Sequence, residues 1–320
     1  MLKKAFVQSG TLLLLLFMTF STLQNPVTGN YIKEITGKAE QVLKEEDPLY
    51  MEIIRKRQEY DQPAVDAVID PVWKAIPGLN GKRIDVQKSY DKMKPAGAFQ
   101  EGLLTFEEIP PEVTLKDLPP APVYKGNPGK PMAGMMVNVA WGNEYLPDML
   151  KTFKKYDVKA TFFLDGSWVK NNPNLAMMIK EEGHEIGNHA YSHPNMQQLS
   201  RERIHDEIRR TNEVINAALN VTPQWFAPPS GSYRDEVVKV AREHGMYTVL
   251  WTVDTVDWKK PDPASMADRV VTKTEPGSLI LMHPTSSTKE GLETMITGIQ
   301  KKGLKLGNLS DVLSEKRSSE

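Results

Sequence analysis

Gly183-His184-Glu185-Ile186-Gly187-Asn188-His189 joins the end of a predicted helix to a short strand that finishes on polar residues. Gly183 follows the amphipathic segment 174–182, and a glycine ends a helix readily because it adopts positive φ without steric cost. Helices and strands alternate in both directions from this point, over about 180 residues. Such alternation predicts a parallel α/β barrel, in which functional side chains gather at the C-terminal ends of the strands.

The elements of this barrel can be placed from apolar periodicity and from capping residues. Strands are expected at 135–139, 159–164, 185–188, 225–226, 247–253 and 278–282. Helices are expected at 146–156, 174–182, 200–219, 236–244, 266–273 and 292–302. Ser200 is the expected N-cap of the longest helix, because its hydroxyl oxygen accepts a bond from a free N–H of the first turn.

Composition narrows the class of protein and its partners. The 320 residues are 40% apolar and 25% charged, which is enough for one sizeable core and a smaller one. The net charge of −1 and the absence of a long basic run argue against binding to nucleic acid. With no cysteine in the chain, disulfides and a cysteine nucleophile are excluded, and any metal ion must be held by histidine and carboxylate.

Residues 1–30 have the pattern of a targeting segment. Lys3 and Lys4 precede the apolar residues 11–20, and the polar residues 21–26 follow. This order is typical of a secretory signal and predicts an extracytoplasmic protein of the cell envelope. The apolar run is short for a spanning helix, and no clear cleavage site follows it, so a cleaved signal and an uncleaved membrane anchor both remain open.

The region between the targeting segment and the barrel has a different composition. Residues 31–116 are charge-rich and predict a small α+β module, with a helix at 40–57 that Asp47-Pro48 divides into two pieces. Its expected role is structural or positioning. Residues 117–131 are rich in proline and glycine and predict a semi-rigid linker. The barrel domain is then expected at 132–312, followed by a polar tail at 313–320.

Polar residues follow several of the predicted strands. His189 and His193 are four residues apart after one strand, which suits a shared metal ion, although such a pair is more often incidental. Asp254 and Asp257 follow a second strand, and His283 follows a third. Each could instead be a helix cap or a satisfied buried polar group, but their joint position at strand ends favours a functional site.

Five segments in a fixed order make the chain similar to a known family. They are Lys159 to Phe163, Gly183 to Pro194, Phe226 to Gly231, Asp254 to Trp258 and Leu279 to His283. In these segments the region 131–312 resembles the NodB-homology polysaccharide deacetylases of carbohydrate esterase family 4. The resemblance implies a distorted (β/α) barrel that removes N-acetyl groups from an acetylated amino-sugar polymer, chitin-like or peptidoglycan.

The resemblance fails where the chemistry should be. In the family a Thr-Phe-Asp-Asp-Gly segment supplies a general base and a metal ligand, and an arginine pairs with the base. In register with Gly142, the base position holds Ala140, the ligand position holds Trp141, and the arginine position holds Ala227. Neither replacement on this segment can accept a proton or bind a cation. Joint loss of a base and its partner avoids a stranded buried charge.

The remaining family roles can be assigned residue by residue. The resemblance implies that His189 and His193 face the metal position, that His283 is the general acid, and that Asp254 orients His283. It also implies that the substrate is contacted by Pro229, Trp258 and Leu281, and Trp141, which departs from the family, is a further candidate for this contact. Trp141 is either an aromatic platform for a sugar or a side chain that fills vacated space.

A zinc-like divalent ion is therefore expected to bind weakly, with only half of its ligand set. Asp165, after the strand 159–164, is a possible substitute ligand, and Glu144 is a second carboxylate near the site. We expect weak or lost hydrolysis of C–N bonds in N-acetyl groups. The alternative is a non-catalytic carbohydrate-binding or interaction protein on the same barrel, in peptidoglycan maturation or spore formation.

Overall fold

The structure, a computed structural model, describes Phe20, residues 25–28, residues 30–31 and residues 47–317. Most of the predicted targeting segment, the helical piece at 40–46 and the last three residues lie outside this part of the chain. None of the described helices combines the length and the apolar character needed to cross a bilayer.

The chain forms two compact units. One comprises Met1–Gln62 and Lys82–Glu107, and the other comprises Pro63–Gly81 and Glu108–Glu320. The first unit contains the helices α3 (Pro48–Tyr60) and α4 (Val86–Met93), the short 3-10 turns η1 (Lys94–Ala96) and η2 (Glu101–Leu103), and the start of the ribbon formed by β3 (Gly81–Ile84) and β4 (Phe106–Ile109).

A small apolar core holds the first unit together. It consists of Leu49, Ile53, Ile84, Tyr90 and Met93. The expected break at Asp47-Pro48 is the start of α3, because the Asp47 side chain accepts a hydrogen bond from the Leu49 N–H and Pro48 needs no acceptor for its nitrogen. This cap explains why the apolar pattern stops and restarts at this point.

The second unit is built on an eight-stranded parallel sheet in the described part of the chain. Its strands are β5 (Met132–Val139), β6 (Thr161–Leu164), β7 (Glu185–Asn188), β8 (Trp225–Phe226), β9 (Tyr247–Thr248), β10 (Val253–Asp254), β11 (Leu279–Met282) and β12 (Lys305–Gly307). The order is β10-β11-β5-β6-β7-β8-β9, with β12 also paired to β5. All eight residues of β5 are buried, as expected for a strand with cover on both faces. The sheet curls into a half-barrel, which confirms the predicted (β/α) barrel class.

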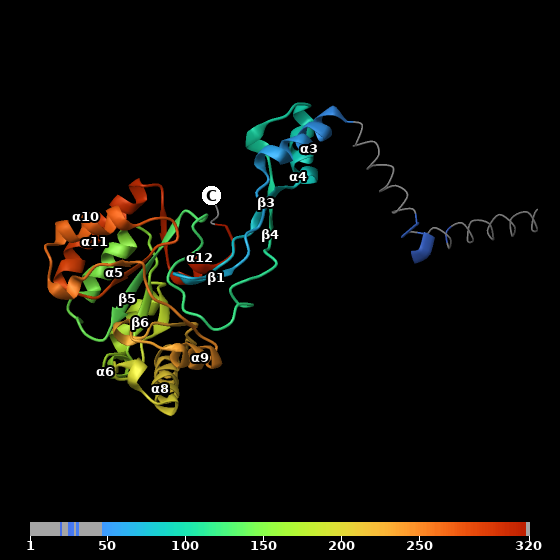
Figure 1. Cartoon of the computed structure of the whole chain (residues 1–320). Coiled ribbons are helices and arrows are strands. Elements are labelled where there is room, and N and C mark those ends of the chain that lie inside the picture. The colour runs from blue at the N-terminus through green and yellow to red at the C-terminus, as the bar shows by residue number, and fades with distance from the viewer. Residues whose placement is uncertain (1–19, 21–24, 29, 32–46, 318–320) are drawn as a thin grey trace, which may run out of the picture. The chain divides into compact units, whose positions relative to one another are not determined.

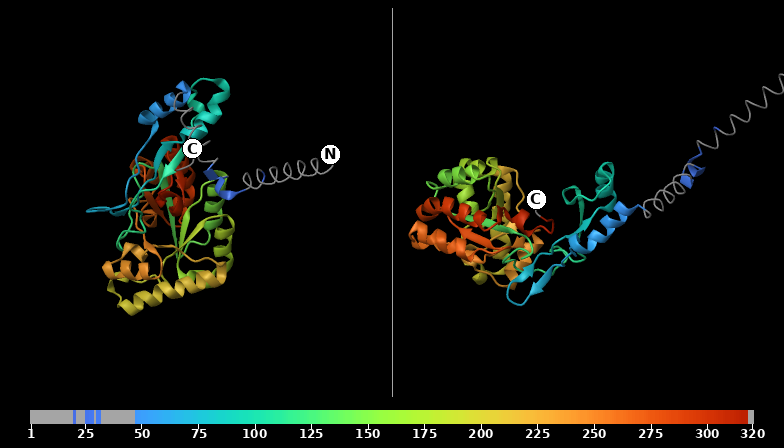
Figure 2. Two further views of the ribbon diagram at one scale, coloured as in Figure 1. Left: turned by 90° about the vertical axis from the view of Figure 1, so that its right-hand side faces the viewer. Right: turned by 90° about the horizontal axis from the view of Figure 1, so that it is seen from above.

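Helices connect these strands and cover the sheet. They are α5 (Leu146–Lys155), α6 (Gly166–Asn171), α7 (Pro173–Glu181), α8 (Arg201–Leu219), α9 (Asp235–Glu243), α10 (Pro263–Lys273), α11 (Ser286–Lys301) and α12 (Leu309–Leu313). The views in Figures 1 and 2 show α5, α10 and α11 packed together, and α8 beside α6 and α9. Ser200 caps α8 as predicted, since its side chain accepts a bond from the Arg203 N–H.

The strand expected at 247–253 is two strands. β9 ends at Thr248, and β10 begins at Val253 with a different neighbour, β11. The reason is a segment from outside the predicted barrel domain. The Val123 N–H donates to the Thr248 oxygen over 2.9 Å, and the Leu250 N–H donates to the Val123 oxygen over 2.8 Å. Val123 thus takes the hydrogen bonds that a continued strand would have used.

The unit boundaries differ from those expected from composition. Val123, within the proline-rich segment 117–131, is fully buried and packs in one cluster with Phe163 and Val249. The hairpin of β1 (Val68–Asp70) and β2 (Lys74–Ile76) also belongs to the second unit, and Ala75 joins the same cluster. The prolines, which lack an N–H, led to the prediction of a linker for this segment. Val123 nevertheless uses both its N–H and its carbonyl oxygen in hydrogen bonds to the barrel.

Candidate active site

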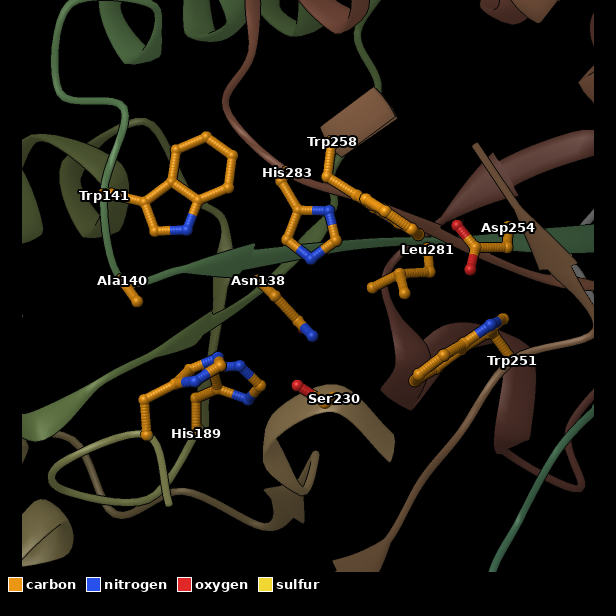
Figure 3. A pocket seen from close by; sticks show the side chains of 11 residues that line it. Asn138, Ala140, Trp141, His189, Ser230, Trp251, Asp254, Trp258, Leu281 and His283 are labelled. Atoms are coloured by element: carbon orange, nitrogen blue, oxygen red, sulfur yellow. The ribbon is translucent and has the colours of Figure 1, made fainter. Parts of the chain in front are cut away.

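The C-terminal ends of the parallel strands surround a cavity of about 440 Å³, which Figure 3 shows from close by. Its polar lining residues are Asn138, His189, His193, Ser230, Asp254 and His283. Its aromatic lining residues are Trp141, Trp251 and Trp258, and Ala140 and Leu281 complete the wall. The sequence placed functional residues at this end of the barrel, and the structure brings them to one cavity.

One wall of the cavity carries a buried carboxylate with several donors. Asp257 Oδ1 lies 2.8 Å from His283 Nδ1, and Asp257 Oδ2 accepts hydrogen bonds from the His283 N–H at 2.6 Å and from the Thr288 hydroxyl at 2.6 Å. The Asp257 side chain is 0% exposed. Burial by itself raises the pKa of Asp257, but the hydrogen bonds and charge of His283 together with the Thr288 hydroxyl lower it below the usual value. Because this carboxylate accepts the Nδ1–H, the Nε2 atom of His283 is the one left for a ligand.

The partner of His283 is Asp257, so the prediction that Asp254 orients this histidine is wrong. Asp254 lines the cavity, and its Oδ1 accepts the Val256 N–H at 2.7 Å. Val256 has a φ of 51°, a left-handed conformation that is unfavourable for a β-branched residue. That turn follows β10 and precedes the 3-10 turn η5 (Asp257–Lys259), which places the later carboxylate beneath His283.

The opposite wall carries two histidines. His189 follows β7 and is buried, and its Nδ1 lies 2.7 Å from the backbone oxygen of Ala227. Burial lowers the pKa of His189 to about 3, and the nearby charge of His193 acts in the same direction. The ring is therefore neutral near pH 7, with the hydrogen on Nδ1 and the lone pair on Nε2. The two rings meet edge to face with centroids 5.2 Å apart.

The loop that carries His193 is held by a carboxylate from the next helix. Glu207 of α8 is fully buried, and its oxygens accept bonds from the N–H groups of Tyr191 and Ser192, each at 2.8 Å, and from the Ser192 hydroxyl. Three donors to one carboxylate fix the backbone between the two histidines. Sequence reasoning did not single out Glu207, because its role depends on contacts across 15 or 16 residues of chain.

Positions 140 and 141 also line the cavity, and they hold an alanine and a tryptophan, neither of which carries a carboxylate. Trp141 is 46% exposed as a residue, and its ring stacks on the His283 ring, with centroids 5.9 Å apart and planes at 8°. The next residue fixes this position: Gly142 has a φ of 84°, and a Cβ there would lie 2.0 Å from the Pro284 oxygen. The close approach of these two loops keeps the indole over the histidine.

The donor set does not complete a metal site. Within residues 47–317 and the other described positions, no group of three or more His, Asp or Glu side chains could share an ion. Asp165 is the N-cap of α6, with Oδ1 accepting the Trp168 N–H at 2.8 Å, and it is absent from the cavity lining. Glu144 is exposed and also lies outside the lining. The structure thus does not support Asp165 as a substitute ligand, and two histidines remain.

The cavity lining differs from the sequence prediction: it includes residues that were not predicted, and it lacks Pro229, which was. Ser230 and Trp251 line the cavity although the sequence did not single them out, and Asn138 lines it although its position early in its strand makes it a weak candidate from the sequence. Pro229 starts the 3-10 turn η4 (Pro229–Gly231) and is buried behind the wall, and its neighbour Ser230 faces the cavity. Ser230 has a φ of 55°, and this turn of the backbone is what no local sequence pattern indicates.

A parallel half-barrel with a histidine–carboxylate pair and a second histidine pair at its strand ends defines a class of carbohydrate esterase. Comparison with known proteins gives the same class. The family model for polysaccharide deacetylase matches residues 125–249. Over 198 residues, 60% of this chain and 75% of the relative, the chain is 31% identical to the peptidoglycan-N-acetylmuramic acid deacetylase PdaA of Bacillus subtilis. This chain belongs to the polysaccharide deacetylase family, carbohydrate esterase family 4.

Three further matches extend over more of the chain. It is 48% identical to the uncharacterized protein YlxY of Bacillus subtilis over 98% of both chains. The crystal structure of wild-type BA3943 from Bacillus anthracis, described as a CE4 family pseudoenzyme, matches with a TM-score of 0.80 and 52% identity over 85% of this chain and 97% of that one. A mutant of BA3943 described as having restored enzymatic activity matches with a TM-score of 0.80 and 51% identity, over 84% of this chain and 99% of that chain.

Proposed function

We propose that the protein holds an acetylated amino-sugar chain of the cell wall in its cavity with little or no hydrolysis. The observation that carries this proposal is the composition of the cavity wall. Three tryptophans and a histidine–carboxylate pair are present, and the positions of the base and of the carboxylate ligand hold Ala140 and Trp141. Sugar rings present C–H faces that pack on tryptophan, and these contacts need no metal and no base.

The chemistry of the remaining groups supports binding over turnover. The Nδ1 atom of His283 is bonded to Asp257, and its Nε2 atom could donate a proton to a leaving amine. Ala140 and Trp141, which stand at the positions of the base and the carboxylate ligand, cannot accept the proton of an attacking water. We propose that His189 and His193 bind a zinc-like divalent ion more weakly than a complete ligand set does. A general acid without its base leaves the first step of the hydrolysis uncatalysed.

The similarities to known proteins support the same proposal. The relative PdaA is a peptidoglycan deacetylase by name, and BA3943 is described as a pseudoenzyme. We infer an acetylated amino-sugar polymer such as peptidoglycan as the ligand and an extracytoplasmic location, with residues 1–30 acting as an export signal or an anchor. No nucleic acid is expected as a partner.

The test combines turnover and binding on the same protein. Acetate release from N-acetylated chitooligosaccharides and peptidoglycan fragments would be measured with added zinc, and binding of the same glycans would be measured by calorimetry. Binding with acetate release near the uncatalysed rate supports the proposal. Substantial zinc-dependent acetate release by the unmodified protein would overturn it, and so would a failure to bind any of these glycans.

A matched pair of variants separates a missing base from a collapsed site. Ala140→Asp supplies a carboxylate, and Ala140→Asn supplies the same shape without the charge. We expect acetate release from the first variant only, because a carboxylate can accept the proton of an attacking water and an amide cannot. A mutant of the relative BA3943 is described as having restored enzymatic activity. Equal behaviour of both variants would show that more than the base is missing.

A further inference from the structure

One polar side chain of the cavity has no role in the account above. Asn138 lies on β5, is 3% exposed and lines the cavity. In the described residues its Oδ1 is one of four buried side-chain atoms without a hydrogen-bond partner, and the only one of them that belongs to a lining residue. Figure 3 shows the amide reaching into the space between His189 and His283. A buried carbonyl oxygen in this state has given up its bonds to water without replacing them.

A second buried asparagine shows what a structural role looks like in this fold. Asn188, on β7, donates from Nδ2 to the Ile208 oxygen at 3.0 Å and to Asn212 Oδ1 at 2.8 Å. Its own Oδ1 accepts the Ala190 N–H at 2.8 Å. Both ends of that amide are therefore used by the protein. The contrast indicates that Asn138 is kept for a group that is not part of the chain.

We propose that Asn138 recognises the acetamido group of the bound sugar; this inference rests on the proposed function. A primary amide offers an N–H donor and a carbonyl acceptor, and an acetamido group offers the complementary carbonyl oxygen and N–H. Either orientation of the Asn138 amide therefore finds a partner on an acetylated sugar. A bond from the acetamido N–H to Oδ1 would also remove the cost of leaving that oxygen unpaired in the wall.

The deacetylated form of the same sugar suits this position less well. Its ammonium group can donate to Oδ1 but offers nothing to the amide N–H, and it brings a charge into the wall beside β5. The only carboxylate in the described cavity lining is Asp254, on β10, which is separated from β5 by β11. Asn138 therefore gives the cavity a preference for acetylated over deacetylated amino sugars.

The experiment compares two glycans and two variants. Calorimetry at pH 6.0, where the amino groups of glucosamine are protonated, would measure the affinity of the wild type for a tetramer of N-acetylglucosamine and for a tetramer of glucosamine. Asn138→Leu removes the amide and keeps the approximate volume, and Asn138→Asp replaces the donor with a negative charge. We expect the leucine variant to lose about tenfold in affinity for the acetylated tetramer, the worth of one hydrogen bond, with little change for the deacetylated one.

Two further readouts separate recognition from a structural role. The leucine variant should melt at or above the wild-type temperature, because it removes an unpaired polar group, whereas Asn188→Leu should melt well below it. The aspartate variant should favour the glucosamine tetramer. Unchanged affinity of Asn138→Leu for the acetylated tetramer would overturn this inference and leave the proposed function standing. A lower melting temperature with equal loss of both glycans would assign Asn138 a structural role. Wild-type protein that binds neither these tetramers nor the peptidoglycan fragments would overturn both proposals.

Discussion

The two sides of the cavity differ in buried charge: one keeps a carboxylate with its hydrogen-bond donors, and the other has uncharged side chains. On the side of β10 and β11, the buried carboxylate of Asp257 is kept with three donors around it. On the side of β5 and β8, Ala140 and Ala227 occupy the positions that we assign, from the resemblance to the family, to a base and its arginine. In each case no charge is left alone. Stranding one buried charge costs several kcal/mol, whereas removing both members of a pair can be nearly neutral, so both sides are compatible with a well-packed barrel.

The largest effect is expected from rebuilding the empty side. Ala140→Asp combined with Trp141→Asp returns a base and a carboxylate ligand, and general base catalysis alone contributes about 10²–10⁴-fold to a rate. Acetate release from N-acetylated chitooligosaccharides with added zinc should rise by that order over the wild type. The control is the same double change to asparagine. If the asparagine pair is as active as the aspartate pair, the two sides do not differ in the way described.

Placing one charge on the empty side should destabilise the fold. Ala227 is fully buried, so Ala227→Arg strands a cation and should lower the free energy of unfolding by about 3–5 kcal/mol. Adding Ala140→Asp should recover part of that loss, which a double-mutant cycle with urea denaturation measures. Ala227→Met controls for side-chain size. A cycle with no coupling energy would show that these two positions do not form a pair.

Removing the charge from the occupied side should cost somewhat less. Asp257→Asn keeps the shape but weakens the bonds from His283 and Thr288, and we expect a loss of about 3 kcal/mol in the free energy of unfolding at pH 7. The pKa of Asp257 is lowered in the folded protein, so its contribution is complete above the unfolded pKa near 4 and is lost as the pH falls through the folded value. Asp254→Asn is the control in the same loop, and equal losses in both variants would contradict the assignment of Asp257.

Acidic pH should destabilise the wall that carries His189. Its pKa is lowered to about 3, below the unfolded value, so the unfolded chain binds a proton that the folded protein does not. Stability is complete above about pH 6.5 and falls by roughly 2 kcal/mol per buried histidine by pH 5. His184, whose pKa burial lowers to about 4, adds a slope of the same sign. Urea denaturation at pH 7 and pH 5 measures this fall in the free energy of unfolding. In the His184→Leu variant the fall should be smaller, because only His189 then contributes to it.

The smallest effect concerns the aromatic wall. Trp141→Ala should weaken binding of N-acetylated oligosaccharides by about tenfold, the scale of one aromatic contact, and Trp141→Phe should lose less. The two readings of Trp141 separate here. A sugar platform predicts lower affinity with little change in melting temperature, because the ring is 46% exposed. A space-filling role predicts the reverse.

Much of this architecture follows from local patterns. The strand and helix alternation from β5 to α11 was predictable, because apolar periodicity and caps such as Ser200 act over a few residues. The residues His189, His193 and His283 were also placed at one cavity by the rule that parallel strands share a functional edge. Composition predicted a linker at 117–131, but Val123 in this segment forms backbone hydrogen bonds to the barrel.

What could not be predicted depends on backbone turns and on distant partners. Choosing Asp257 over Asp254 requires the left-handed turn at Val256, which a β-branched residue rarely adopts. Ser230 lines the cavity where Pro229 was predicted to do so, and this difference also comes from a backbone turn, the positive φ at Ser230. The unpaired state of Asn138 is a property of its three-dimensional surroundings, so no pattern along β5 could indicate it.

The pair formed by Asp257 and His283 has an evolutionary consequence. Replacement of His283 alone would leave a buried carboxylate without its main donor, and replacement of Asp257 alone would leave the donors on His283 and Thr288 without an acceptor. Folding stability therefore opposes each single step of drift, whether or not the protein turns over a substrate. A histidine embedded in this way, proposed here as the general acid, is retained for stability even where no reaction takes place. In this family an intact acid is thus poor evidence of an active enzyme, and the uncharged side of the cavity is the better diagnostic.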